Sequence, residues 1–307
     1  MRIRDLALIT ISLLNGSLAF GSGPDLDPNP LVKRYLKLPE ADCGALKTSE
    51  VGNGIETSDF KPVIQIEIQG RKGEKTFPHL CTGSLMKGGA KIFTSAHCLC
   101  LPKDETLSDS WVGDDQVREP DFILHPKAAA ACKAGLPIPP EYDIAFLRVP
   151  LFAGPSKSLL VNGKVLEKLK ALGSYEIGTD ELKVNTEFTL VGFGQHRLGG
   201  TDPTGADVYD GKKRYGTNRI EKIDRKTQMI FSPGRTKPAK DSEKLGTGVG
   251  VLFGDSGGPL LIGGKVYGVA CQLDPGLFGT ESGYTAVFNP SNADFIRTTL
   301  AMPDDKL

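Results

Sequence analysis

The most informative stretch of the sequence is the glycine-rich hexamer Gly254–Pro259, which contains a single serine, Ser256. Glycines let the backbone turn tightly and aim its N–H groups into a small concavity, where a serine in the turn presents its hydroxyl. We expect the N–H groups of Gly254 and Ser256 to hold the oxyanion that forms when the hydroxyl attacks a carbonyl group. The structural alternative is a glycine-rich hairpin with an inert serine.

A serine hydroxyl is a weak nucleophile near neutral pH and needs a base beside it. Among four histidines, His97 is the candidate, because it follows an apolar run at a point where the chain would turn out of a core. The base in turn needs an acceptor that fixes its tautomer and stabilises its charged form. Asp143 is placed for this role, because it leads the apolar run Ile144–Leu147. Taken alone, each residue would more often be an ordinary structural histidine or a turn aspartate.

The composition predicts the kind of scaffold that must position these groups. The 307 residues allow about two compact lobes, and 39% hydrophobic residues supply a core. The 37 basic and 37 acidic side chains cancel, which argues against a nucleic-acid binder that relies on bulk positive charge. The 37 glycines and 21 prolines favour many turns between short strands.

Local patterns indicate strands over most of the chain. Ile64, Ile66 and Ile68 alternate with polar residues, which is the period of a half-buried strand. Gly263 and Gly264 separate two apolar runs and predict a two-residue hairpin. Further short apolar or β-branched runs lie at residues 91–95, 144–149 and 188–191.

Two helices are expected among these strands. The apolar residues between 165 and 172 fall on one helical face, and Gly173 can end that helix. Ser291 and Asp294 resemble a capping box that opens a terminal helix. The strands form two sets separated by residues 150–185, so the pattern predicts an all-β domain of two packed barrels.

The first residues indicate export. Positive charge at Met1–Arg4, an apolar run at 6–14 and small residues at 17–19 form the three parts of a secretory signal. We therefore expect a signal peptide over 1–19 and a lead-in or pro-segment over 20–50, with a buried N-terminal helix as the alternative. No later run is apolar enough to span a bilayer, so we expect no membrane association after cleavage. Export also allows the six cysteines to form disulfides.

Three motifs together resemble those of trypsin- and chymotrypsin-like serine endopeptidases: Thr94–Cys98, Asp143–Leu147 and Gly254–Pro259. Their order, His then Asp then Ser, is that of this fold and differs from the order in subtilisins and α/β-hydrolases. Supporting matches are Cys81–Leu85, His125–Pro126 and Gly192–Gly194. The resemblance covers about residues 51–300, leaves a tail at 301–307, and implies two packed six-stranded antiparallel β-barrels with a C-terminal helix.

The resemblance also implies a role for each motif residue. Ser256 attacks the scissile carbonyl, His97 takes its proton and returns it to the leaving amine, and Asp143 orients the imidazole. Activity should then fall below about pH 6–7 as His97 becomes protonated. The implied partners are protein or peptide substrates; we expect a monomer that uses no nucleic acid, cofactor or metal.

The activation signal departs from the family pattern. Relatives are usually cut after a basic residue, and the new terminal amine pairs with the aspartate before the nucleophile, here Asp255. The corresponding new terminus would be Val51, but Glu50 precedes it and the nearest upstream basic residue is Lys47. Zymogen processing at Glu50–Val51 is therefore a hypothesis.

The residues of the resembled substrate pocket also depart from the pattern. The position that carries an acid in Arg/Lys-specific members is a glycine here, and a buried guanidinium without a carboxylate lacks its partner. We expect cleavage after an uncharged, small or apolar residue, in a slot that Leu273 can narrow. The pocket positions are Gly250, Val251, Cys271, Gln272, Leu273 and Ser282.

The resemblance pairs some of the six cysteines. It implies a bridge between Cys81 and Cys98 beside the histidine, and it puts Cys100 and Cys132 in neighbouring loops, so we pair these too. Six cysteines allow 15 connectivities, and sequence alone does not choose among them. The other two, Cys43 and Cys271, are either joined to each other or free.

Two rival interpretations remain. One is a protease-like binding module that kept the fold and lost turnover. The unusual activation terminus and the altered pocket favour this alternative, whereas the presence of all three motifs opposes it. The other is a zinc-stabilised domain built around His97–Cys100, which lacks a second close pair of ligands elsewhere.

Overall fold

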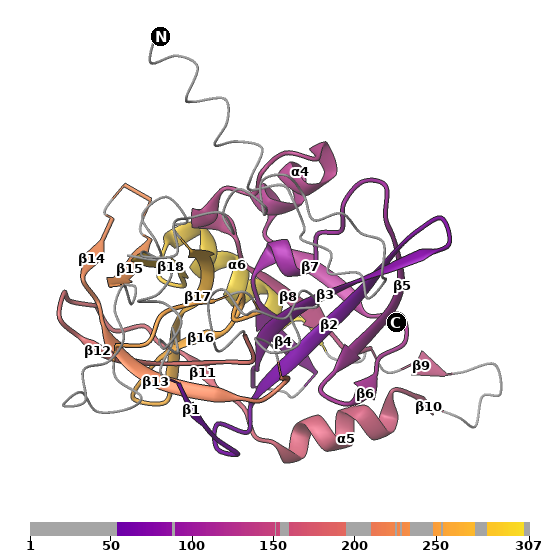
Figure 1. Cartoon of the computed structure of the whole chain (residues 1–307), viewed down its shortest axis with the longest axis horizontal. Helices are drawn as coiled ribbons and strands as arrows, with labels where there is room; N and C mark the ends of the chain where they lie inside the picture. Colours follow the sequence, from indigo (N-terminus) through magenta and orange to yellow (C-terminus); the bar gives the residue numbers. More distant parts are fainter. Residues whose placement is uncertain are drawn as a thin grey trace, which may run out of the picture.

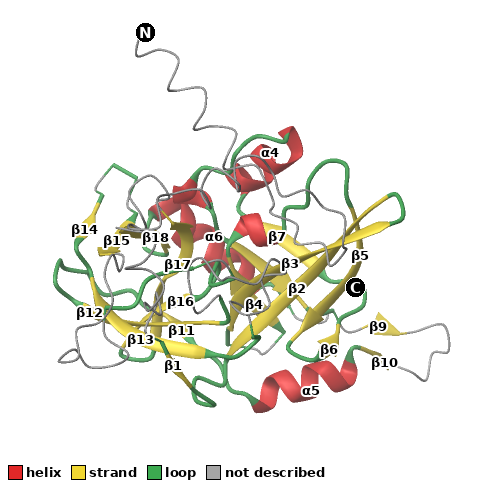
Figure 2. Ribbon diagram, in the orientation of Figure 1, coloured by secondary structure: helices red, strands yellow, loops and turns green. Residues whose placement is uncertain are grey.

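The computed structural model describes residues 54–87, 90–150, 152–153, 160–194, 210–224, 226–227, 229–233, 248–252, 254–273 and 281–303. The expected signal peptide and lead-in, together with Val51 and Cys43, lie outside these residues. The described part forms two curled, mainly antiparallel sheets that lie side by side (Figure 1). Strands and loops dominate and α-helices are few (Figure 2), which confirms the expected all-β class.

The first sheet is built from residues 63–148. Its strand order is β6-β5-β2-β3-β4-β8-β7. Ile64, Ile66 and Ile68 are buried and their polar neighbours are partly exposed, so the predicted alternation is confirmed. The strands are β2 (Val63–Lys72), β3 (Lys75–Leu85), β4 (Lys91–Thr94), β5 (Thr106–Val112), β6 (Asp115–Gln116), β7 (Asp121–Leu124) and β8 (Ala145–Arg148).

The second sheet has the order β1-β13-β12-β16-β17-β18-β15-β14, and β11 pairs with β17 in parallel. Each sheet contains six strands of at least four residues, to which two-residue strands are added. The strands are β1 (Ile55–Glu56), β11 (Glu176–Ile177), β12 (Glu187–Gly192), β13 (Arg214–Arg219), β14 (Lys222–Ile223), β15 (Ile230–Pro233), β16 (Pro259–Ile262), β17 (Lys265–Leu273) and β18 (Glu281–Ala286). A separate short pair joins β9 (Phe152–Ala153) to β10 (Leu160–Val161).

The predicted hairpin joins β16 to β17. Ile262 pairs with Lys265, and the two residues between them, Gly263 and Gly264, have φ of 57° and 78°. Two consecutive positive φ values match the twist of the flanking strands and favour glycine. This local prediction is confirmed.

The helices agree only in part with the sequence patterns. Helix α5 (Gly163–Ala171) buries the predicted apolar face, and Gly173 follows it with φ of 82°. Helix α6 (Pro290–Ala301) is also present, but the expected capping box is wrong, since Asn289 caps the helix by accepting the N–H of Ser291 at 3.0 Å. Asn is a favoured cap residue, and a proline directly after it suits the first helical position.

Helix α4 (Pro126–Ala134) was not expected. It is rich in alanine and therefore lacks the apolar periodicity on which a helix prediction depends. The side chain of His125 caps it by accepting the N–H of Lys127, and Gly135 ends it with φ of 65°. Two 3₁₀ turns, η2 (Ala96–Cys98) and η3 (Pro140–Tyr142), complete the described elements.

One core cluster joins the two sheets. Phe93 and Phe146 from the first sheet lie in the same buried cluster as Val191 and Val269 from the second, together with Ile296 of α6. The two phenylalanine ring centroids are 4.9 Å apart. Fully burying one such side chain contributes about 1.5–3 kcal/mol. This cluster holds the ends of β4 and β8 against the strands that follow the serine motif.

Candidate active site

The pairing of β4 with β8 brings His97 and Asp143 together. Thr94 pairs with Ala145 in this antiparallel ladder, so the end of β4 lies beside the start of β8. His97 lies in η2, directly after β4, and Asp143 directly follows η3. Two residues that are 46 positions apart in the chain therefore meet at the adjoining ends of two neighbouring strands.

The Asp143 carboxylate contacts His97 twice. Its Oδ1 accepts the backbone N–H of His97 at 2.8 Å, and its Oδ2 lies 2.5 Å from the ring Nδ1. The Asp143 side chain is 6% exposed, whereas that of His97 is 37% exposed. Burial acts to lower the pKa of His97, but the charge and the hydrogen bond of Asp143 oppose it, and the pKa is raised above its usual 6.5.

The turn that carries Ser256 docks on the first sheet. Gly254 and Gly257 have φ of 93° and 79°, a region that disfavours other residues. A Cβ on Gly257 would lie 2.0 Å from the Thr94 hydroxyl, so the close approach of the turn also requires glycine. The N–H of Gly257 donates to the carbonyl of Ala270 at 2.7 Å, which ties the turn to β17.

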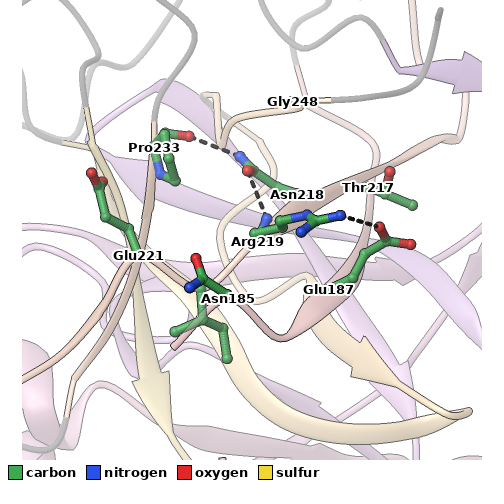
Figure 3. Close-up of a pocket in the computed structure, with 9 residues that line it drawn as sticks. Asn185, Glu187, Thr217, Asn218, Arg219, Glu221, Pro233 and Gly248 are labelled. Carbon is green, nitrogen blue, oxygen red and sulfur yellow. Dashed lines mark hydrogen bonds and ion pairs between the residues drawn. The ribbon is translucent and has the colours of Figure 1, made fainter. Parts of the chain in front are cut away.

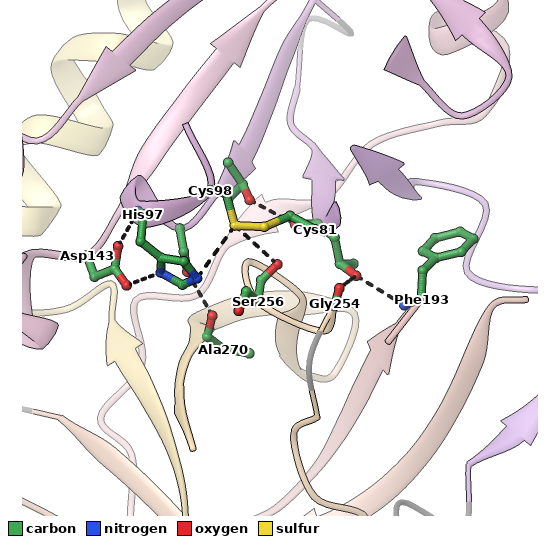
Figure 4. Close-up of a disulfide and its surroundings, with 11 residues drawn as sticks. Cys81, His97, Cys98, Asp143, Phe193, Gly254, Ser256 and Ala270 are labelled. Carbon is green, nitrogen blue, oxygen red and sulfur yellow. Dashed lines mark hydrogen bonds and ion pairs between the residues drawn. A yellow bond between two sulfur atoms is a disulfide. The ribbon is translucent and has the colours of Figure 1, made fainter. Parts of the chain in front are cut away.

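Ser256 lies on the side of the imidazole that faces away from Asp143 (Figure 4). The disulfide sulfur of Cys98 is 3.9 Å from His97 Nε2 and 3.6 Å from the Ser256 carbonyl oxygen. Among the hydrogen bonds of the described residues, none joins the Ser256 hydroxyl to Nε2. Such contacts are often long without substrate and tighten in the bound complex.

The same turn presents backbone donors. In the part of the chain that the structure describes, the N–H groups of Gly254 and Ser256 meet no acceptor. Two such N–H groups from one turn can hold a negatively charged oxygen. The hydroxyl, the imidazole and these donors together provide a nucleophile, a base and an oxyanion site, which are the groups that acyl transfer requires.

The Asp255 carboxylate lies in a recess lined by Gly192 and Gly194. Its carboxylate accepts the N–H of Gly194 at 2.8 Å and the N–H of Leu252 at 3.0 Å. A Cβ on Gly192 would lie 2.0 Å from its Oδ1, and a Cβ on Gly194 would lie 2.6 Å from its Cγ, so a side chain at either position would have to displace Asp255. Burial raises the pKa of Asp255 to about 6, although the two N–H donors and the charge of Arg214 act to lower it.

The structure brings most of the predicted pocket positions together. Gly250 and Val251 are buried, and the N–H of Val251 donates to the hydroxyl of Ser282 at 3.0 Å. Gln272 and Leu273 pair with Gly283 and Ser282, but their side chains lie outside the described set.

Cys271 carries a free thiol, which lies 3.6 Å from the Gly283 carbonyl. Burial raises the pKa of this thiol, so the thiol stays protonated near neutral pH.

Two further hydroxyl residues support the site, and neither is among the candidate residues that the sequence patterns single out. The buried Ser95 hydroxyl donates to the Ala270 carbonyl at 2.7 Å, which links the start of η2 to the second sheet. The buried Thr285 hydroxyl donates to the Pro140 carbonyl at 2.7 Å and so holds the turn before Asp143. Ser95 lies within the histidine motif, whereas no sequence signal singles out Thr285.

Two disulfides flank the histidine. One joins Cys81 to Cys98 and the other joins Cys100 to Cys132, which are the pairs that the resemblance implied. The sulfur atoms of Cys81 and Cys98 cluster with a ring nitrogen of His97. A thiolate is the metal ligand, so disulfide-bonded cysteines do not serve, and the zinc alternative loses its ligands.

A hollow of about 500 Å³ lies apart from these residues, at the ends of β12 and β13 (Figure 3). Arg219 forms an exposed ion pair with Glu187 at 3.8 Å there, and Asn218 donates to the Pro233 carbonyl at 2.8 Å. None of the predicted site residues lines this hollow.

No helix in the described ranges is long and apolar enough to cross a membrane.

Comparisons with known proteins agree with this arrangement. A family model described as trypsin matches residues 53–296, whereas no curated protein matches the sequence. Neuropsin, a serine protease of mouse brain, is 18% identical with a TM-score of 0.51 over 80% of this chain and 98% of its own. Human heparin binding protein is 16% identical with a TM-score of 0.51 over 83% and 98%. A Glu endopeptidase is 13% identical with a TM-score of 0.51 over 81% and 97%.

At these identities the structural likeness concerns the fold alone, and it confirms the expected chymotrypsin-like architecture. The family model spans most of the chain. The chain therefore belongs to the trypsin family of serine proteases.

Proposed function

We propose that the chain is an exported endopeptidase that cleaves peptide bonds through an acyl-enzyme on Ser256. The observation that carries this proposal is the double contact between Asp143 and His97, with the Ser256 turn beside the free edge of the imidazole. The short signal-like N-terminal segment and the two disulfides support export.

The first step forms the acyl-enzyme. The Ser256 oxygen attacks the scissile carbonyl carbon while its proton passes to His97 Nε2, and the oxyanion is held by the N–H groups of Gly254 and Ser256. The C–N bond then breaks, and His97 gives the proton to the leaving amine. Water repeats the sequence at the acyl carbon, which releases the acid and restores the Ser256 hydroxyl.

Asp143 serves this chemistry by position and charge. A proton on Nδ1 donates to its carboxylate, so the Nε2 lone pair is left to accept the proton of Ser256. The carboxylate also stabilises the imidazolium that forms during each transfer. The second contact, to the His97 backbone N–H, holds the start of η2 in place.

The pocket residues support an uncharged side chain before the cleaved bond. Gly250, Val251 and Ser282 carry no carboxylate, and the Ser282 hydroxyl already accepts the N–H of Val251. A buried guanidinium would therefore lack a charged partner there. Cleavage of a diverse peptide pool should produce few products that end in Arg or Lys, and a profile dominated by Arg would contradict this assignment.

A fluorophosphonate probe tests the nucleophile without knowledge of the substrate. The full chain, purified as the expressing cell processes it and with its amino terminus sequenced, should be labelled, and Ser256→Ala should abolish the labelling. Ser108→Ala is the matched control, because this partly buried hydroxyl donates to Gln69 in the first sheet. Labelling that survives in Ser256→Ala would contradict the proposal. Folded wild-type protein that is never labelled would favour the binding-module alternative.

A further inference from the structure

Thr82 links the first sheet to the turn that carries Ser256. It lies in β3 and is fully buried. Its backbone N–H donates to the Ser256 carbonyl at 2.8 Å, and its hydroxyl donates to the Gly254 carbonyl at 2.8 Å. The same hydroxyl accepts the N–H of Phe193 at 3.1 Å. The dashed lines that reach Gly254 and Phe193 in Figure 4 mark the two hydroxyl contacts.

The direction of the hydroxyl proton follows from these partners. A backbone N–H can only donate, so the bond from Phe193 uses a lone pair of the Thr82 oxygen. A carbonyl can only accept, so the single hydroxyl proton goes to Gly254. The hydroxyl therefore satisfies one buried donor and one buried acceptor at once, and an apolar replacement would leave both without a partner.

These contacts hold the two peptide units that flank the Asp255–Ser256 unit, which carries the N–H of Ser256. Because a peptide unit is planar, holding the oxygen of one residue also sets the direction of the next residue's N–H, so the Asp255 oxygen governs the N–H of Ser256. The oxygens of Gly254 and Ser256 are held by Thr82, and the oxygen of Asp255, which lies between them, accepts the N–H of Gly258 at 2.8 Å. Thr82 thus supplies two of three successive carbonyl contacts in the turn.

We propose that Thr82 is a positioning residue, whose hydroxyl holds the Gly254–Asp255 peptide unit and so sets how the N–H groups of Gly254 and Ser256, on either side of that unit, are turned toward the substrate carbonyl. This inference rests on the proposed function of Ser256. Removing one oxyanion donor in a serine protease slows turnover by about 10²–10³-fold. Thr82 acts through those donors without touching the substrate, so we expect a smaller loss.

The test compares the rates at which the full chain and its variants react with a fluorophosphonate. We expect Thr82→Val to react about 10–100-fold more slowly than the wild type at a temperature where both are folded, since it lacks the hydroxyl but keeps the shape. Thr82→Ser keeps the hydroxyl and should react within about threefold of the wild type. The pH midpoint of the reaction should not move in Thr82→Val, because the contact between His97 and Asp143 is intact.

The controls separate positioning from general stability. Ser110→Ala removes another fully buried hydroxyl of the first sheet, one that donates to Val117 at 2.8 Å, and should leave the rate unchanged. If Thr82→Val does not fold, Thr82→Ala provides the same comparison with a smaller side chain. A wild-type rate in Thr82→Val or Thr82→Ala would overturn the inference, and so would a Thr82→Ser variant as slow as Thr82→Val. Loss of labelling in Ser256→Ala alongside either result would leave the proposed function standing.

Discussion

The Asp143 carboxylate contacts His97 at two points: its Oδ1 accepts the backbone N–H at 2.8 Å, and its Oδ2 lies 2.5 Å from the ring Nδ1. One side chain therefore sets both where the histidine backbone lies and how its ring is turned. The nitrogen that remains, Nε2, faces the Ser256 turn. The acid–base behaviour of the site should follow from this pair.

The first prediction concerns pH. Burial acts to lower the pKa of His97, but Asp143 opposes it and the pKa lies above 6.5. The base must be neutral, so the rate of labelling at Ser256 should rise with pH through a midpoint above 6.5. Rates measured from pH 4 to 9 check this, and a flat profile down to pH 4 would contradict His97 as the base.

Asp143→Asn provides the matched comparison for the pH profile. The variant should react on the order of 10⁴-fold more slowly, because an amide favours the wrong imidazole tautomer. Its residual midpoint should move down, since the charge that raises the pKa of His97 is gone. The same charge should stabilise the folded wild type below about pH 6.5, and that contribution should be lost as the pH rises through the raised pKa.

The second prediction concerns the carboxyl of Asp255. Its pKa is raised from 3.8 to about 6 because burial penalises the charged form. Between these values the folded chain holds a proton that the unfolded chain releases, so the free energy of unfolding should fall as pH rises. Relative to Asp255→Asn, the wild type should lose up to about 3 kcal/mol between pH 4 and 7.

Urea unfolding of the wild type and Asp255→Asn at several pH values measures this difference. A difference that instead grows in favour of the wild type with pH would contradict the prediction. It would indicate that a cation pairs with the carboxylate, as the amine of Val51 would after cleavage at Glu50–Val51. Sequencing the amino terminus of the same material distinguishes that outcome.

The third prediction concerns the glycine recess. A Cβ at Gly194 would lie 2.6 Å from the Cγ and 2.8 Å from the backbone nitrogen of Asp255, so Gly194→Ala must displace the residue next to Ser256. We expect a stability loss of about 1–3 kcal/mol and labelling that is more than about tenfold slower. Gly73→Ala is the control, because its Cβ would meet nothing within 4 Å and only its φ of 61° is unfavourable. Equal labelling rates in the two variants would refute a tight recess.

The fourth prediction separates the two disulfides. The Cys100–Cys132 bridge spans 32 residues, and replacing both cysteines with serine should lower the free energy of unfolding by about 3–4 kcal/mol. The labelling rate of the folded variant should stay within about twofold of the wild type. Replacing Cys81 and Cys98 should slow labelling as well, because the Cys98 sulfur lies 3.9 Å from His97 Nε2. Denaturant unfolding and labelling rates measure both effects, and a slow Cys100/Cys132 variant would contradict the separation.

Local sequence patterns are sufficient to predict several secondary-structure elements. The alternation in β2 and the hairpin at Gly263 and Gly264 depend on neighbours in sequence, and both are present as expected. Helix α4 could not be predicted because its alanines form no apolar stripe. The predicted cap of α6 is wrong because Asn289, and not Ser291, caps this helix. These errors concern local signals that were weak or ambiguous.

The sequence by itself determined the candidate residues, since residue type and motif order single out His97, Asp143 and Ser256. Only the tertiary structure decided that β4 and β8 bring the first two into contact, and that Thr82 and Ser95 reach the second sheet. These hydrogen bonds join residues 172 and 175 positions apart, so their existence depends on how two sheets pack together. No periodicity within either sheet contains that information.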